Sequence, residues 1–182
     1  ADLMAAWAGL GYYARARNLL SCARLIAREY AGQLPPEEEA LRRLPGIGAY
    51  TAAAIAAIAF GRRAVMVDAN VERVVARLFA VEEPLPAART RIRALADSIT
   101  PDTRAGDFAQ AMMDLGSGIC SARAPRCDSC PLAQPCRARR TGKKKPAFRR
   151  VPCLRVHVPL DQAACSALMR ALRRLLWRAA LL

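Results

Sequence analysis

The sequence predicts an all-α fold. Apolar residues recur every three to four positions along most of the chain up to residue 119, which is the period of an amphipathic helix. Glycines and prolines stand between these stretches, where they end one helix and begin the next. The chain has 182 residues, 54% of them hydrophobic, which is enough for one domain with a sizeable core.

The spacing of apolar residues in the N-terminal part predicts three helices. A short amphipathic helix over residues 3–10 is ended by glycines, and a longer one follows over Ala14–Tyr30 with arginines on its polar side. A third helix is expected to start near Pro35, because the fixed φ of proline suits a first turn, and Glu37–Glu39 would lie where the helix dipole favours anions. The expected apolar face of the second helix comprises Leu19, Leu20, Ala23, Ile26 and Ala27.

A short loop, Leu44–Gly48, precedes an alanine-rich helix over Ala49–Phe60 that is apolar on nearly every side and therefore belongs in a core. Gly46 and Gly48 bracket one apolar residue, which allows a tight turn whose backbone N–H groups face outward beside a helix N-terminus. This is the pattern of a helix-hairpin-helix phosphate clamp. The alternative is an ordinary interhelical turn.

Asp68 and Asn70 stand at the entrance of the next helix. As an isolated feature, either residue would be a helix cap, whereas the functional alternative for Asp68 is a carboxylate that stabilises a developing cation. Further helices are expected over Thr90–Ile99 and Phe108–Leu115, the second ended by Gly116. The apolar stripe of the helix that follows Asp68 comprises Val71, Val74, Val75 and Leu78.

Four cysteines lie close together, with six, two and five residues between them. Pro125 and Pro131 flank the central CxxC turn and make a long helix there unfavourable. Converging thiolates of this kind bind zinc or a [4Fe-4S] cluster, and the spacing alone does not distinguish these two. A disulfide or cysteines without a ligand are the remaining alternatives. These residues are Cys120, Cys127, Cys130 and Cys136; three other cysteines, Cys22, Cys153 and Cys165, are scattered.

Positive charge is concentrated around and after the cysteines. The net charge is +14, and residues 121–150 hold ten Lys or Arg against a single acid, Asp128. A solvated basic tail is one interpretation. Nucleic acid is the better-supported partner, because neutralised phosphates give strong, sequence-independent affinity. The longest weakly polar run, Ala49–Phe60, is too short to cross a bilayer, so no membrane association is expected.

Taken in order, the hairpin Leu44–Gly48, Asp68 twenty residues later, and the four-cysteine loop resemble the helix-hairpin-helix DNA glycosylases related to endonuclease III. The resemblance covers about residues 1–140. Within that superfamily, the strings Gly9–Leu19 and Ala111–Gly116 are similar to the MutY-type adenine glycosylases, which remove adenine mispaired with 8-oxoguanine or guanine. In that family the four cysteines hold a [4Fe-4S] cluster.

The resemblance also implies roles for single residues. Asp68 would be catalytic, stabilising the oxocarbenium-like transition state. Tyr50 stands where the endonuclease III branch has a nucleophilic lysine, which implies a monofunctional glycosylase without lyase activity. Contacts to double-stranded DNA would come from the hairpin and from Asn70. The implied DNA-binding residues are Pro45, Gly46, Gly48, Tyr50 and Asn70.

The chain departs from the family pattern in two places. Ala69 replaces the usual glycine of an Asp-Gly-Asn motif, at a cost of about 1 kcal/mol or more if the backbone needs a positive φ there. The family's general-acid glutamate has no counterpart in this sequence. We therefore expect an N-terminally truncated chain with impaired catalysis. Two rival functions are an endonuclease III-like enzyme for oxidised pyrimidines and a noncatalytic iron–sulfur DNA-binding module.

The expected organisation has four parts: an incomplete helical core over 1–119, a cluster loop over 120–136, a basic linker over 137–150, and an unassigned remnant over 151–182. In the remnant, partial alternation predicts a strand near Val151–Leu160 and a basic amphipathic helix after it. The protein is expected to be a monomer in the bacterial cytoplasm, associated with the nucleoid.

Overall fold

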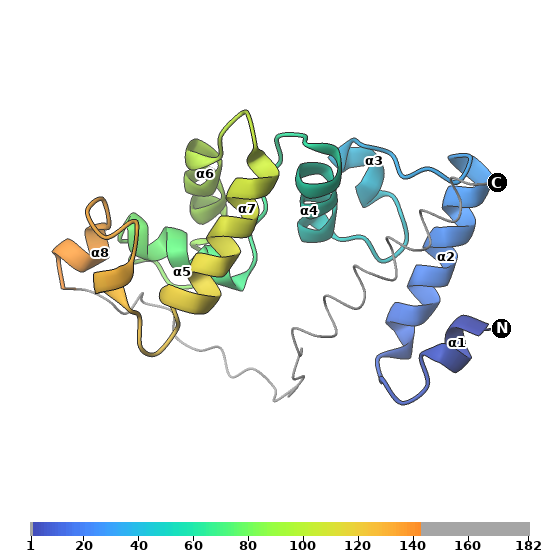
Figure 1. Ribbon diagram of the computed structural model, residues 1–182, viewed down its shortest axis with the longest axis horizontal. Helices are drawn as coiled ribbons and strands as arrows, with labels where there is room; N and C mark the ends of the chain where they lie inside the picture. The colour runs from blue at the N-terminus through green and yellow to red at the C-terminus, as the bar shows by residue number, and fades with distance from the viewer. Residues whose placement is uncertain (1, 143–182) are drawn as a thin grey trace. The chain divides into compact units, whose positions relative to one another are not determined.

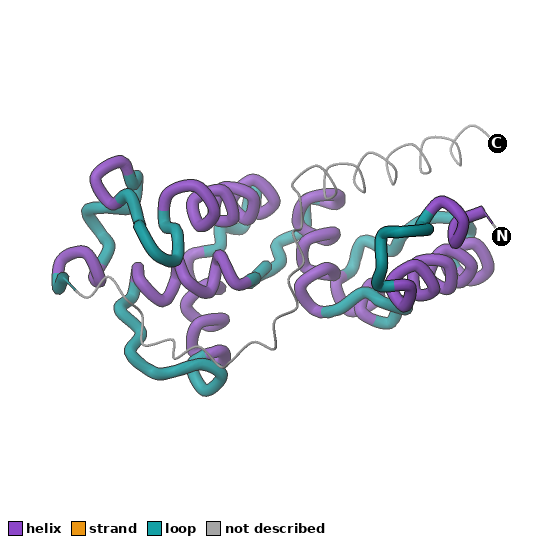
Figure 2. The backbone as a smooth tube through the Cα atoms, turned by 90° about the horizontal axis from the view of Figure 1, so that it is seen from below, coloured by secondary structure: helices purple, strands orange, loops and turns teal. Residues whose placement is uncertain are grey.

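The computed structural model describes residues 2–142, and every regular element in that range is helical, so the predicted all-α class is confirmed (Figures 1 and 2). The strand and helix expected in residues 151–182 lie outside the described residues. Within 2–142, no helix is long and apolar enough to span a membrane. The elements are α1 (Asp2–Ala6), α2 (Tyr13–Glu29), α3 (Glu38–Arg42), α4 (Ala49–Phe60), α5 (Ala69–Leu78), α6 (Arg89–Ile99), α7 (Ala105–Asp114), the π-helix η1 (Leu115–Ile119), the 3-10 helix η2 (Cys127–Ser129) and α8 (Arg137–Arg140).

Two groups of buried side chains form the core of the described region. The first is built from α2, α3 and α4 together with Ala109 of α7, and the second from α5, α6, the end of α7 and the start of η1. Helix α7 runs between α4 and α5 in Figure 1, and Met113 of α7 packs against both groups. One helix therefore joins the two halves of the core.

The close crossing of α7 and α4 depends on small residues. Helix α4 buries four alanines, as its uniformly apolar sequence predicted. A Cβ at Gly106 of α7 would lie 2.4 Å from the carbonyl oxygen of Ala57 and 3.0 Å from the Ile58 Cα. Because both of these are backbone atoms, no side chain can move aside to make room, and the glycine fixes how closely the two helices approach.

Two expected helix features are corrected by the structure. Helix α3 begins at Glu38 and not near Pro35, because Glu37 is still extended, with φ −84° and ψ 132°. In α2 the side packed on the core carries Cys22, Leu25 and Ile26, while Ala23 and Ala27 are exposed. The short side chain of alanine contributes little to burial on either side, so it marks the core-facing stripe poorly.

The end of α7 also differs from expectation. The helix ends at Asp114 and continues as a π-helical turn, η1, so Gly116 is not its end. Gly116 is buried, and a Cβ there would lie 2.7 Å from the Cβ of Asn70. This glycine permits a close approach to α5, a role that local sequence signals cannot distinguish from a helix stop.

Replacing Gly106 with alanine is expected to destabilise the fold by about 1–3 kcal/mol, because the new methyl group would overlap the α4 backbone. Urea denaturation followed by circular dichroism measures this directly. Gly118→Ala is the matched control, since a Cβ at Gly118 would have no neighbour within 4 Å; its effect should stay within about 0.5 kcal/mol. Equal stabilities for the two variants would contradict the close crossing.

Candidate functional site

The two glycines of the hairpin turn differ in backbone conformation and in the space around them. Gly46 has φ 77°, and a Cβ there would lie 2.8 Å from the Asn18 Cβ on α2, so both backbone and space require glycine. Gly48 is the N-cap of α4, with φ −83° and ψ 173°, and a Cβ there would meet nothing within 4 Å. No side chain among the described residues caps this helix. The exposed start of α4 therefore offers backbone N–H groups and a positive dipole end to an anion.

Tyr50 lies in the first turn of α4 and is 41% exposed. Its hydroxyl donates a hydrogen bond to the thioether sulfur of Met113 on α7, at 3.3 Å. This hydrogen bond connects the side chain that follows the hairpin to the C-terminal end of α7.

Asp68 is the N-cap of α5, as the capping interpretation predicted. Its Oδ1 accepts a hydrogen bond from the backbone N–H of Val71 at 2.7 Å, and its Oδ2 accepts one from Nδ2 of Asn70 at 3.1 Å. Capping does not use up the carboxylate, because each oxygen still has a free lone pair for another partner. Ala69 is the first residue of α5 and has no positive φ, so the expected strain from the missing glycine does not arise.

Arg73, one turn further along α5, connects Asn70 to the cysteine-rich segment. Its Nη2 donates to Oδ1 of Asn70 at 2.8 Å and to the carbonyl oxygen of Gly116 at 2.7 Å, and its Nε donates to the carbonyl oxygen of Cys120 at 2.8 Å. Partial burial lowers the pKa of this guanidinium, while the nearby Cys120 and Asp68 act against that shift. The result is one hydrogen-bonded line from Asp68 through Asn70 and Arg73 to Cys120.

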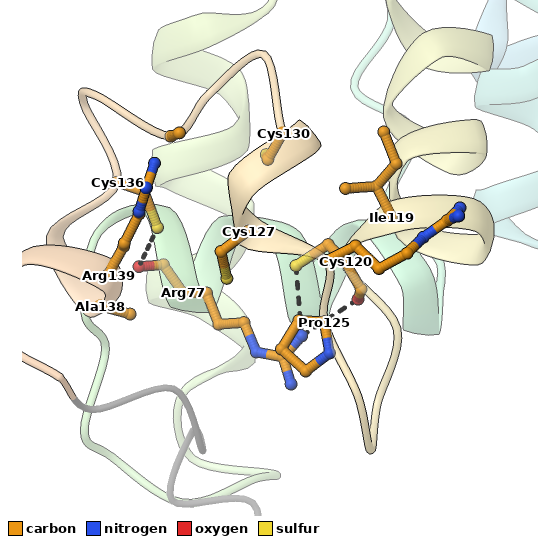
Figure 3. Close-up of a pocket in the computed structure, with 11 residues that line it drawn as sticks. Arg77, Ile119, Cys120, Pro125, Cys127, Cys130, Cys136, Ala138 and Arg139 are labelled. Atoms are coloured by element: carbon orange, nitrogen blue, oxygen red, sulfur yellow. Dashed lines mark hydrogen bonds between the residues drawn. The ribbon is translucent and has the colours of Figure 1, made fainter.

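The four clustered cysteines line a single pocket (Figure 3). All four are free thiols of intermediate exposure. Burial is the largest cause that raises the pKa of Cys130; a hydrogen bond with the Leu132 backbone opposes it, and repulsion from the other three thiols adds to it. Within residues 2–142, no three His, Cys, Asp or Glu side chains converge tightly enough to hold a single metal ion.

Arg77 closes one side of this pocket. It is only 5% exposed, and its guanidinium donates to the carbonyl oxygens of Cys120, Ser121 and Ala122 and to Sγ of Cys120. Sequence reasoning missed Arg73 and Arg77. The signal was present, since two arginines four residues apart lie beside the apolar stripe of one helix, but arginines there normally read as a solvated face.

Residues 1–101 match the model of the HhH-GPD superfamily of base excision DNA repair proteins. The chain belongs to this family. The helix-hairpin-helix resemblance seen in the sequence is thereby confirmed, and the hairpin at Pro45–Gly48 and the turn at Asp68 lie within the matched region.

Among HhH-GPD relatives, the adenine DNA glycosylase of Mycolicibacterium smegmatis is 44% identical over 142 residues, which are 78% of this chain and 48% of that protein. The human adenine DNA glycosylase is 43% identical over 136 residues, covering 73% of this chain and 25% of that protein. This chain thus spans about half the length of the first relative and a quarter of the second.

An endonuclease III solved in a non-covalent complex with DNA has the same fold, with a TM-score of 0.64 and 30% identity. The match covers 79% of this chain and 67% of that one. The helical arrangement described above is therefore that of the HhH-GPD family.

Removing the Arg73 guanidinium, as in Arg73→Met, is expected to destabilise the protein by about 1–3 kcal/mol, because the acceptors on Asn70 and Gly116 would lose their partner in a partly buried place. Chemical denaturation measures the loss. Arg91→Met is the control: Arg91 is an exposed arginine paired with Glu83, and such a pair is worth at most about 1 kcal/mol. A loss no larger than that of the control would show that the connection carries no stability.

Proposed function

We propose that this chain is the hairpin-and-cluster part of an adenine DNA glycosylase, an enzyme that hydrolyses the N-glycosidic bond of adenine opposite 8-oxoguanine or guanine. One observation carries the proposal. Tyr50 contacts Met113, and Asn70 packs against Gly116. Positions 113 and 116 are three residues apart at the end of α7 and its continuation η1, so the two candidate site segments meet at the same place.

The hairpin would bind the DNA backbone beside the extruded nucleotide. The base must leave the stack before its glycosidic bond can be attacked. The exposed turn around Gly46 and Gly48 and the uncapped start of α4 suit a phosphate, whose charge the backbone N–H groups and the helix dipole would stabilise. Pro45 fixes the entry to this turn, which leads directly to Tyr50.

The chemistry follows from the groups at this site. Adenine leaves only after a ring nitrogen is protonated by a general acid, and the bond to the sugar then breaks with positive charge developing on the deoxyribose. Asp68, anchored on both oxygens, would stabilise that charge, and water would supply the oxygen that ends on the sugar carbon. Tyr50 has no amine, so no Schiff base forms and strand cleavage is not expected.

The four cysteines suit a [4Fe-4S] cluster. All four thiols line one pocket, where they could act together as the ligands of one such cluster. The cluster would hold the surrounding basic segment in shape for DNA, and no bond-breaking step passes through it.

We further propose that the 182-residue polypeptide by itself releases adenine slowly or not at all, because no acid in it stands in the family's glutamate motif. The same observation favours a second candidate, a noncatalytic iron–sulfur module that binds DNA. The endonuclease III-like alternative has no such support, since Tyr50 replaces its nucleophilic lysine.

A single-turnover assay on a duplex with adenine opposite 8-oxoguanine tests the activity. The expected result is specific duplex binding with base release far below that of a full-length relative, and no covalent adduct after borohydride reduction. Release at a rate matching the relative would overturn the proposed impairment. An adduct trapped by borohydride would revive the lyase alternative.

Asp68→Asn distinguishes an enzyme from a binding module. Asparagine caps helices as well as aspartate does, so α5 and duplex affinity should be nearly unchanged. Any residual base release should fall by roughly 100-fold or more, because the negative charge beside the sugar is gone. If the unmodified chain binds duplex but shows no release above background, the binding module is the better description.

Metal analysis of the purified chain tests the cofactor. We expect iron and acid-labile sulfide in equal amounts, about four of each per chain for the cubane cluster, and loss of both in Cys127→Ser. One zinc per chain with no sulfide would refute the cluster and leave the proposed glycosylase fold standing.

A further inference from the structure

Arg77 touches both ends of the cysteine set. From the last turn of α5 its Nη1 reaches Sγ of Cys120 at 3.2 Å and the carbonyl oxygens of Cys120 at 3.1 Å and Ser121 at 2.7 Å, and its Nη2 reaches that of Ala122 at 3.1 Å. Its own carbonyl oxygen lies 3.6 Å from Sγ of Cys136 (Figure 3). One residue of α5 therefore contacts the first and the last cysteine of the loop.

We propose that Arg77 is a positioning residue for the cluster: it holds Cys120 in place as a ligand and sets the reduction potential of the cluster through its hydrogen bond to the Cys120 sulfur. This inference rests on the proposed [4Fe-4S] cofactor. It adds a role for a side chain that is not itself a ligand.

Cys120 needs such support more than its partners do. Cys127 and Cys130 share one short turn, η2, in which the N–H of Cys130 donates to the carbonyl oxygen of Cys127. Cys120 lies seven residues upstream of Cys127, after η1. Three carbonyl oxygens in a row bound by one buried guanidinium hold its segment against α5, and arginine's planar fork suits this arrangement in a way that lysine's single ammonium does not.

The contact to sulfur has an electronic consequence as well. A hydrogen bond donated to a ligand sulfur withdraws electron density from the iron and raises the reduction potential. Because Arg77 is 5% exposed, water does not weaken this bond by competition. The loss of the bond should lower the potential even where the cluster stays bound.

Arg73 provides a matched control from the same helix. It is one turn away and donates to the carbonyl oxygen of Cys120, and none of its hydrogen bonds goes to the sulfur. Arg73→Lys and Arg77→Lys both keep the positive charge and both lose the guanidinium fork. Only the second replaces the guanidinium that donates to Sγ of Cys120.

The test compares the cluster-loaded full chain with these two lysine variants, after circular dichroism has shown equal helix content. Iron loss to a chelator should be roughly 10- to 100-fold faster in Arg77→Lys than in the unmodified chain and much less affected in Arg73→Lys. By protein-film voltammetry, the potential of Arg77→Lys should shift to lower values, and that of Arg73→Lys should not.

Equal potentials in the two variants, or equal rates of iron loss, would overturn the role of Arg77. Failure of Arg77→Lys to keep helix content without metal would make it a folding residue and would also overturn the proposal. A purified unmodified chain that binds zinc or no metal would instead overturn the proposed cofactor, so the two failures are distinguishable.

Discussion

Two arginines on one face of α5 connect the cysteine loop to the rest of the protein. Arg73 and Arg77 together donate hydrogen bonds to the carbonyl oxygens of four residues between Gly116 and Ala122. An irregular segment follows η1 in this stretch, so its carbonyl groups do not all have helical N–H groups as hydrogen-bond partners. The guanidinium groups satisfy them, and the geometry of the cysteines then follows from the position of α5.

The same helix carries Asp68 at its start, and this couples two sites that differ in chemistry. The carboxylate is held by the first turn of α5 and by Asn70, which is in turn held by Arg73. Gly116 lets the backbone of η1 approach Asn70 closely enough to complete the arrangement. A shift of the cysteine loop would therefore displace Asp68 through these hydrogen bonds, while the core formed by α2, α3 and α4 would not change.

Much of this could be predicted from the sequence because the signals are local. Short stretches of sequence are enough to identify the hairpin, the apolar α4, the cap at Asp68 and the group of four cysteines. The structure has the turn before α4, the buried alanines of α4 and the cap at Asp68, and the four cysteines line one pocket. What could not be predicted depends on contacts across the chain. Gly116 reads as a helix end but is a point of close approach to α5, and the alanines of α2 do not reveal which side faces the core. The two arginines look like surface charges until their carbonyl partners, more than forty residues away, are known.

The hydrogen bonds of α5 join the cysteine loop and the Asp68 turn into one unit. Amide hydrogen exchange with and without the proposed cluster tests this coupling, with the backbone N–H of Val71, bound by Asp68, as the reporter. Removal of iron should lower the protection of Val71 together with that of Cys120, while α4 keeps its protection. Loss of protection confined to the cysteine loop, with Val71 unchanged, would show that the loop and the Asp68 turn are not coupled.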